Sequence, residues 1–179
     1  KKKRQLYTDI YDDSMWLINL VENLLSVTRI ENGSMNIHET PELLEEVVQE
    51  ALRHINRKKA EHRITFEQED DLLMARMDSR LVIQVIINIV DNAIKYTPPG
   101  SHIDIQTKRE GEWAVVTIAD DGPGIADDVK KRLFDMFFTT DHTHGEGRRG
   151  LGLGLSLCKS IINAHGGTIS VQDNIPRGT

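Results

Sequence analysis

Apolar residues recur every three or four positions from residue 5 to residue 31, and this spacing predicts one long helix. The stripe consists of Leu6, Ile10, Leu17, Leu20, Leu24 and Val27. Neighbouring apolar residues widen it beyond a two-stranded seam, which favours a four-helix bundle. A helix of this length measures ~40 Å, longer than a small domain, so we expect it to pack on another chain. Gly33 is expected to end it as a C-cap.

Downstream of this helix, the apolar period alternates between that of helices and that of strands. Helices are predicted over residues 42–59, 79–96 and 152–165, with a short one over 127–134. Strands are predicted over residues 63–67, 73–77, 103–108, 113–119 and 168–172. Thr40 is expected to cap the first of these helices with Pro41 at its start, and Asp78 or Ser79 to cap the second. Three helices and about five strands in mixed order predict an α+β fold, a two-layer α/β sandwich.

The chain has 179 residues, a formal net charge of −6 and 39% hydrophobic residues, enough for one packed domain with a small appendage. This mildly acidic balance argues against broad nucleic-acid binding. Cys158 is the sole cysteine, which excludes an intrachain disulfide. No apolar run approaches the roughly 20 residues that span a bilayer, so we expect no membrane contact here. Because the sequence begins with Lys1, we read it as a segment of a longer protein.

One face of the predicted helix over residues 79–96 carries an unusual set of polar side chains. Asn88, Asn92 and Lys95 share this face through their spacing of four and three residues. A solvated helix face normally shows Glu and Lys rather than paired Asn residues. On this helix alone, a functional face and a solvated face both remain open.

Two glycine clusters flank a polar segment that runs from residue 126 to residue 149. Asp120 ends an apolar strand and precedes the first cluster, Gly122 and Gly124, so its carboxylate is expected to point into a cleft at the strand end. The second cluster, Gly150, Gly152 and Gly154, leads into a predicted helix. Free N–H groups and the dipole at the start of such a helix can hold a polyphosphate. Each cluster alone is a weak signal, because an aspartate before Gly-Pro is also common in turns.

Taken in order, these features resemble the catalytic, ATP-binding domain of sensor histidine kinases of two-component systems, in the wider gyrase/Hsp90/histidine-kinase/MutL superfamily. The resemblance rests on residues 88–97 (Asn-Ile-Val-Asp-Asn-Ala-Ile-Lys-Tyr-Thr), 120–125 (Asp-Asp-Gly-Pro-Gly-Ile), 133–138 (Leu-Phe-Asp-Met-Phe-Phe) and 150–155 (Gly-Leu-Gly-Leu-Gly-Leu). Residues 16–29 also resemble the potassium- and turgor-responsive subfamily of these kinases.

The resemblance implies two parts. Residues 1–33 are similar to the second helix of the family's dimerisation and histidine-phosphotransfer hairpin. Residues 34–179 are similar to its Bergerat-type ATP-binding domain, a mixed sheet with three helices on one face. We expect the final strand of that domain to lie beyond Thr179.

The roles implied by the resemblance belong to a site for ATP and Mg²⁺. Asn92 would ligate the metal, with Asn88 supporting metal and phosphates, because Mg²⁺ prefers oxygen ligands. Lys95 would contact phosphate, and Tyr96 would lie beside the nucleotide. Asp120 would accept a hydrogen bond from the adenine amino group, which selects adenine over guanine.

The segment over residues 126–149 would form a lid, anchored by Phe137 and Phe138, from which Arg148 or Arg149 would reach the γ-phosphate. Asn88, Lys95 and these two arginines are the candidate catalytic residues. The remaining candidates for nucleotide binding are Gly122, Gly124, Ile125, Gly150, Leu151, Gly152, Leu153, Gly154 and Thr179. Thr179 would support the adenine contact of Asp120.

The family's phospho-accepting histidine sits beside an acidic residue on a first hairpin helix, and no histidine here has that context. We therefore expect the acceptor outside these residues, with the phosphoryl group passing on to a response-regulator aspartate. The resemblance also implies a homodimer through the N-terminal helix, in the cytoplasmic domain of an inner-membrane sensor. ATPases of the gyrase, chaperone and mismatch-repair branch carry Glu where Asn88 stands, which disfavours hydrolysis. A serine-directed kinase and a non-catalytic nucleotide-binding dimerisation module remain as alternatives.

Overall fold

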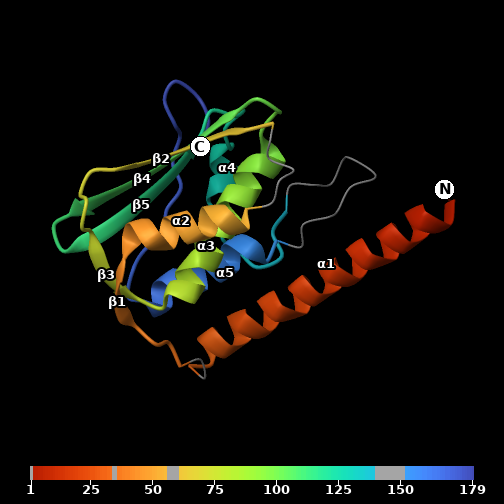
Figure 1. Cartoon of the computed structure of the whole chain (residues 1–179), viewed down its shortest axis with the longest axis horizontal. Coiled ribbons are helices and arrows are strands. Elements are labelled where there is room, and N and C mark those ends of the chain that lie inside the picture. The colour runs from red at the N-terminus through yellow and green to blue at the C-terminus, as the bar shows by residue number, and fades with distance from the viewer. Residues whose placement is uncertain (1, 34–35, 56–60, 140–151) are drawn as a thin grey trace.

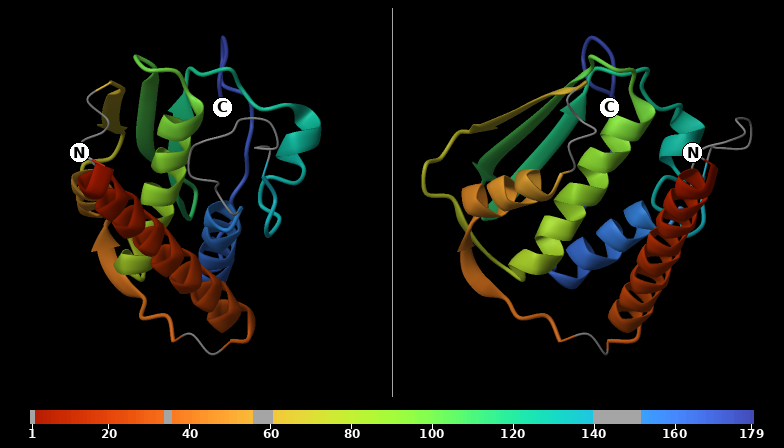
Figure 2. Two further views of the ribbon diagram at one scale, coloured as in Figure 1. Left: turned by 90° about the vertical axis from the view of Figure 1, so that its right-hand side faces the viewer. Right: turned by 45° about the vertical axis from the view of Figure 1, so that its right-hand side comes forward.

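A long helix lies beside an α/β domain in the computed structural model, which describes residues 2–33, 36–55, 61–139 and 152–179 (Figure 1). This helix, α1 (Lys2–Glu31), confirms the predicted element and begins three residues earlier than expected. Gly33 has a φ of +64°, and its N–H donates to the Ile30 carbonyl at 3.0 Å, so it ends the helix as predicted. Ile30 packs against the domain, whereas the N-terminal end of α1 points away from it (Figures 1 and 2). No helix in the described parts of the chain is sufficiently long and apolar to span a membrane.

The strands form two ladders rather than one. In the larger ladder, β4 (His102–Glu110) lies between β2 (Arg63–Gln68), which is parallel to it, and β5 (Trp113–Asp120), which is antiparallel. The antiparallel register places Asp120 opposite Ile103, so the candidate adenine-reading residue lies where the central strand begins.

The smaller ladder corrects one prediction. Thr40 does not cap a helix, because β1 (Thr40–Leu43) pairs antiparallel with β3 (Met74–Met77), and the helix starts only at Leu44. Pro41 fits this edge strand, since an edge position can lack an N–H donor. The pairing partner lies some thirty residues away in the sequence, which is why local spacing did not reveal it.

The helices α2 (Leu44–His54), α3 (Ser79–Tyr96) and α5 (Gly154–Ala164) cover one face of the larger sheet (Figures 1 and 2). This arrangement confirms the predicted two-layer α/β sandwich. The short α4 (Asp127–Lys130) stops four residues before its predicted end and gives way to turns. Residues 168–172 run without ladder pairing, so the strand predicted there is wrong, although Ile169 packs on the core as the apolar alternation required.

Two hydrophobic clusters hold these layers together. The first joins α2 and α3 to the sheet, with Val48, Val90 and Ile105 fully buried. The second joins α3 to α5 through Val85, Leu157, Cys158 and Ile161, and Ile30 of α1 packs on it. Burying such side chains stabilises the fold by roughly 1.5–3 kcal/mol each. Helix α3 belongs to both clusters, so its position is fixed from two sides.

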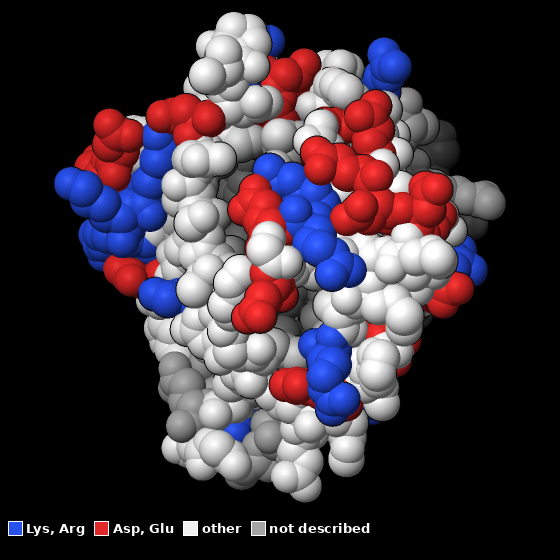
Figure 3. Space-filling model, turned by 90° about the vertical axis from the view of Figure 1, so that its left-hand side faces the viewer, with Lys and Arg blue, Asp and Glu red and all other residues white. Residues whose placement is uncertain are grey.

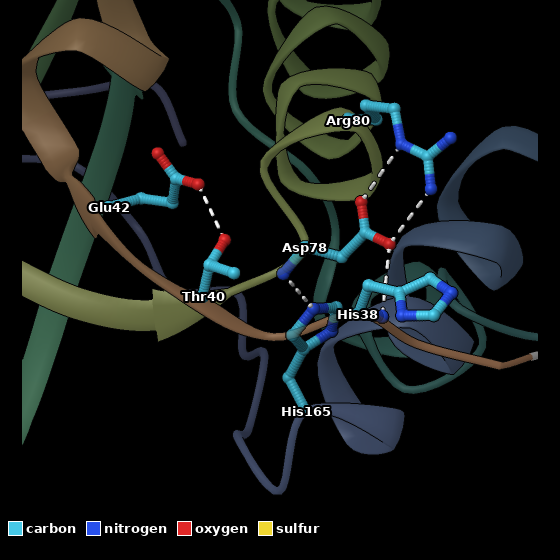
Figure 4. Close-up of polar contacts among 6 residues, drawn as sticks. All are labelled: His38, Thr40, Glu42, Asp78, Arg80 and His165. Atoms are coloured by element: carbon cyan, nitrogen blue, oxygen red, sulfur yellow. Dashed lines mark hydrogen bonds and ion pairs between the residues drawn. The ribbon is translucent and has the colours of Figure 1, made fainter.

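The acidic residue before α3 ties three segments together (Figure 4). The Asp78 carboxylate pairs with the Arg80 guanidinium at 3.3 Å and accepts the N–H of His38 at 3.3 Å. The backbone N–H of Asp78 donates to Nε2 of His165, whose Nδ1 lies 2.7 Å from the Ile161 carbonyl in α5. The Asp78 side chain makes no capping hydrogen bond, so the predicted cap is replaced by these longer-range contacts.

Burial disfavours ionisation of the Asp78 carboxyl, but the Arg80 guanidinium and the His38 N–H outweigh it and lower its pKa. A carboxyl with a lowered folded-state pKa stabilises the fold above its ordinary pKa, and this contribution is lost as the pH falls through the folded-state value.

Asp78→Asn should therefore reduce the free energy of unfolding by about 1–3 kcal/mol at pH 7. The difference from the native chain should shrink as the pH falls from 5 to 3, in urea titrations. The exposed Asp70→Asn variant is the control. A difference that is constant over this range would contradict the assignment.

Charged side chains are interspersed on the face of the molecule seen in Figure 3, where acidic and basic groups lie next to each other. Exposed ion pairs of the structure include Lys108–Glu110 at 2.6 Å and Arg53–Glu50 at 2.8 Å. A mixed pattern is typical of a solvated surface.

Candidate nucleotide-binding site

The first and last of the four sequence boxes meet at the contact between α3 and α5. A Cβ atom added to Gly154, at the start of α5, would lie 3.9 Å from Cγ of Asn88 in α3. A helix N-terminus offers unpaired N–H groups to an anion. The structure thus brings the carboxamide of Asn88 beside the end of a helix that can hold phosphate.

The Asn88 carboxamide is unusual in its pairing. Its Nδ2 atom is buried and has no hydrogen-bond partner among the described residues. The Cys158 sulfur beside the amide is a weak acceptor and does not replace an oxygen partner. Burial raises the pKa of this thiol to about 12, and the interaction with the amide only partly opposes the rise. An unpaired buried polar group costs about 1–3 kcal/mol, and a phosphate oxygen would satisfy it. Because a carboxamide also offers an oxygen to Mg²⁺, this residue fits a metal–polyphosphate group.

The C-terminal half of α3 carries the remaining residues of the first box. Asn92 is half-buried, one turn after Asn88 on the same face. Lys95 and Tyr96 are exposed and contact each other, with Nζ 2.8 Å from the phenol oxygen and 4.5 Å from the ring centroid. The predicted stripe over Asn88, Asn92 and Lys95 therefore exists as one helix face.

Asp120 is held firmly at the end of β5. Its N–H donates to the Thr179 carbonyl at 2.8 Å, and its own carbonyl accepts from Nδ2 of Asn174 at 2.8 Å. Carboxylate Oδ1 accepts the N–H of Gly122 at 2.9 Å. No hydrogen bond joins Oδ2 to any of the described residues, so this oxygen can accept from a ligand amino group.

The glycines around Asp120 permit close approach of neighbouring atoms. A Cβ atom on Gly122 would lie 2.5 Å from Cγ2 of Thr97, and one on Gly178, at φ +109°, would collide with the Asp120 carbonyl. Gly124 has a φ of +80°. At Gly124 and Gly178 the positive φ favours glycine, which adopts such backbone angles at low cost, whereas at Gly122 the Thr97 methyl leaves no room for a side chain.

Gly152 forms a second close contact, with the aromatic box. Its φ is +67°, and a Cβ atom there would lie 2.6 Å from the Phe138 nitrogen. The Phe137 N–H donates to the Gly152 carbonyl at 3.1 Å, while the Phe137 side chain is 58% exposed. Phe137 and Phe138 therefore meet Gly152 through their backbone, whereas Met136 of the aromatic box packs on the core cluster that includes Leu157 of α5. Leu153 is buried in the core.

Part of the predicted site lies outside the described residues, namely Arg148, Arg149, Gly150 and Leu151. Ile125 is half-buried in the loop after Gly124, and Thr179 reaches Asp120 through its backbone carbonyl.

Sequence reasoning missed two polar residues near Asp120: Asn174, and His62, which contacts Thr97. Neither forms part of a periodic pattern, and the contacts span 54 and 35 residues. Only the folded chain brings them to the site.

Comparison with known proteins places this geometry in a family. The family model described as histidine kinase-, DNA gyrase B-, and HSP90-like ATPase matches residues 77–179, more than half of the chain. The chain belongs to this family. Sensor protein KdpD of Clostridium acetobutylicum is 44% identical over 169 residues, which cover 94% of this chain and 19% of that protein. This chain thus spans about a fifth of the length of that relative, and the resemblance to sensor histidine kinases is confirmed.

Solved structures agree with this fold. Full-length ShkA in complex with AMPPNP superposes with a TM-score of 0.83 at 22% identity, covering 99% of this chain and 37% of that one. Histidine kinase ThkA in complex with response regulator protein TrrA gives a TM-score of 0.68 at 28% identity, covering 90% and 46%. The mixed α/β architecture is therefore that of histidine kinase catalytic domains.

Gly152→Ala should destabilise the chain more than Gly166→Ala, which serves as the matched control. Both glycines have positive φ, +67° and +72°, but a Cβ atom on Gly166 meets nothing within 4 Å. The control should lose about 1–2 kcal/mol of unfolding free energy, and Gly152→Ala about 1–3 kcal/mol more through overpacking. Urea unfolding measures both, and equal losses would show that the aromatic box does not press on Gly152.

Proposed function

We propose that this site binds ATP with Mg²⁺ and that the chain is the kinase domain of a bacterial sensor histidine kinase. It would transfer the γ-phosphoryl group to a histidine outside these residues, for relay to a response-regulator aspartate. The observation that carries this proposal is the set of hydrogen bonds at Asp120. Its backbone N–H and carbonyl are both hydrogen-bonded, and its Oδ2 is available to a ligand. A relative of this fold carries AMPPNP and another is bound to a response regulator, which supports the proposal.

Each part of the site would perform a separate task. Asp120 would accept from the adenine amino group, and guanine, with an oxygen at that position, would be repelled. Asn88 and Asn92 would hold the metal, which neutralises phosphate charge when bound. Lys95 would contact a phosphate oxygen, and the N-terminus of α5 at Gly154 would hold the polyphosphate.

The chemistry of Asn88 favours transfer over hydrolysis. A carboxamide cannot remove a proton from water at neutral pH, so this position supplies no general base. Phosphoryl transfer needs chiefly positioning and charge stabilisation, which amides, lysine and helix N–H groups can provide. The acceptor histidine would supply the nucleophile.

Helix α1 supports a dimer as the working form. Leu17, Val21, Leu24 and Leu25 are between 38% and 53% exposed along it. A stripe of this kind is stable when another helix covers it. We assign residues 1–33 to a dimerisation hairpin and residues 34–179 to the ATP-binding domain of a cytoplasmic portion of a membrane sensor.

Asp120→Asn should weaken ATP binding roughly 10- to 100-fold, because a charge-assisted hydrogen bond contributes about 1.5–3 kcal/mol. Calorimetric titration with ATP and Mg²⁺ measures the affinity, and the exposed Asp70→Asn variant should bind like the native chain. Unchanged affinity in Asp120→Asn would show that the adenine site is elsewhere.

Transfer is tested by mixing this chain with a separate helical hairpin that carries the acceptor histidine and with γ-labelled ATP. Acid-labile label on the hairpin supports the kinase. Free phosphate without labelled hairpin would indicate an ATPase, and binding without either product would indicate a nucleotide-binding dimerisation module.

A further inference from the structure

His62 lies against the C-terminal end of α3, where it contacts Thr97. Its Nε2 atom is 3.0 Å from the Thr97 hydroxyl, and Thr97 is 9% exposed. Backbone hydrogen bonds on both sides fix this approach. The Gly100 N–H donates to the Glu61 carbonyl at 2.5 Å, and the Arg63 N–H donates to the Ser101 carbonyl at 3.0 Å. These two hydrogen bonds hold the start of β2 against the turn that follows α3.

The hydrogen-bond directions at this contact follow from the donors available. The single hydroxyl hydrogen of Thr97 donates to the Ala93 carbonyl at 2.7 Å, since a carbonyl can only accept. The hydroxyl oxygen therefore accepts from Nε2–H of His62. The Nδ1 atom of this ring is buried and has no partner among the described residues.

The Thr97 methyl group connects the contact with His62 to Gly122. Hydroxyl and methyl share one Cβ, so fixing the hydroxyl between His62 and Ala93 also fixes the methyl direction. Cγ2 of Thr97 faces Gly122, where an added Cβ atom would lie only 2.5 Å away. Gly122 in turn donates its N–H to Oδ1 of Asp120 at 2.9 Å.

We propose that His62 is a positioning residue for nucleotide selection. Through the Thr97 methyl and the Gly122 N–H, it sets the direction of the Asp120 carboxylate and so the preference for adenine over guanine. This inference rests on the proposed nucleotide-binding function.

The buried Nδ1 atom of the half-buried His62 supports a positioning role over a packing role. An unpaired buried ring nitrogen is unfavourable, and an apolar residue there would not carry that penalty. Replacing His62 by Leu should therefore change thermal stability little while reducing nucleotide selectivity.

The test measures the dissociation constants of ADP and GDP, with Mg²⁺ present, by calorimetry on this chain. His62→Leu should weaken ADP binding roughly 3- to 10-fold, the net effect of one hydrogen bond, and leave GDP binding unchanged. His62→Gln, which restores an N–H at the position of Nε2, should recover most of the ADP affinity. His54→Leu, the same change at an exposed histidine, should leave both constants unchanged.

A double-mutant cycle tests the route through Thr97. Thr97→Val keeps the shape and removes the hydroxyl, and combined with His62→Leu it should lose no more ADP affinity than either single change. Additive losses, or an unchanged ADP-to-GDP ratio in a folded His62→Leu variant, would overturn the inference. If Asp120→Asn weakens ADP binding while His62→Leu does not, only this inference fails, whereas a native chain without ADP binding removes the proposed function as well.

Discussion

The packing of α3 between the sheet and α5 is the constraint on which the rest of the site depends. Val90 faces the sheet side and Val85 the α5 side, so the helix cannot rotate without exposing one cluster. The residue before it, Asp78, is tied to the end of α5 through His165, and the residue after it, Thr97, is tied to His62, which precedes β2. A helix fixed in rotation and at both ends holds its polar face in one direction, which a metal–polyphosphate site requires.

Backbone contacts set the geometry on the other side of the site. At Gly122, Gly152 and Gly178 a Cβ atom would collide with a side chain or with main chain. A close contact between main-chain atoms cannot be relieved by rotating a side chain, so it fixes the local geometry more tightly than a contact between side chains does. Asp120 gains from this, since Gly178 permits the carbonyl contact and Asn174 completes it. In the proposed site, these glycines therefore shape the part that would read the base as well as the part that would hold phosphate.

The sequence predicted those helices and strands whose own residues are sufficient to define them. Helix α3 has the predicted bounds, because its apolar stripe is dense and the turn after it contains two prolines. The residues of β1 were predicted to start a helix, because Thr-Pro before apolar residues is compatible with a helix start and with an edge strand. The pairing with β3 makes this segment a strand. Residues 168–172 alternate like a strand yet have no ladder, because pairing depends on a neighbour. The site residues came from motif order, whereas His62 and Asn174 required the folded contacts.

Two buried side-chain nitrogens have no partner among the described residues. Nδ2 of Asn88 belongs to α3 itself, and Nδ1 of His62 belongs to a ring that contacts Thr97, the residue after α3. Chains generally pair buried polar groups, so an unpaired one marks a place where another requirement outweighs stability. At Asn88 the requirement we propose is ligand binding, because the amide stands beside the N-terminus of α5. At His62 the proposed requirement is the positioning of Thr97, which the opposite ring nitrogen contacts. One cost therefore lies within α3 and the other at the contact with its C-terminal end, which are the phosphate end and the base end of the same proposed nucleotide.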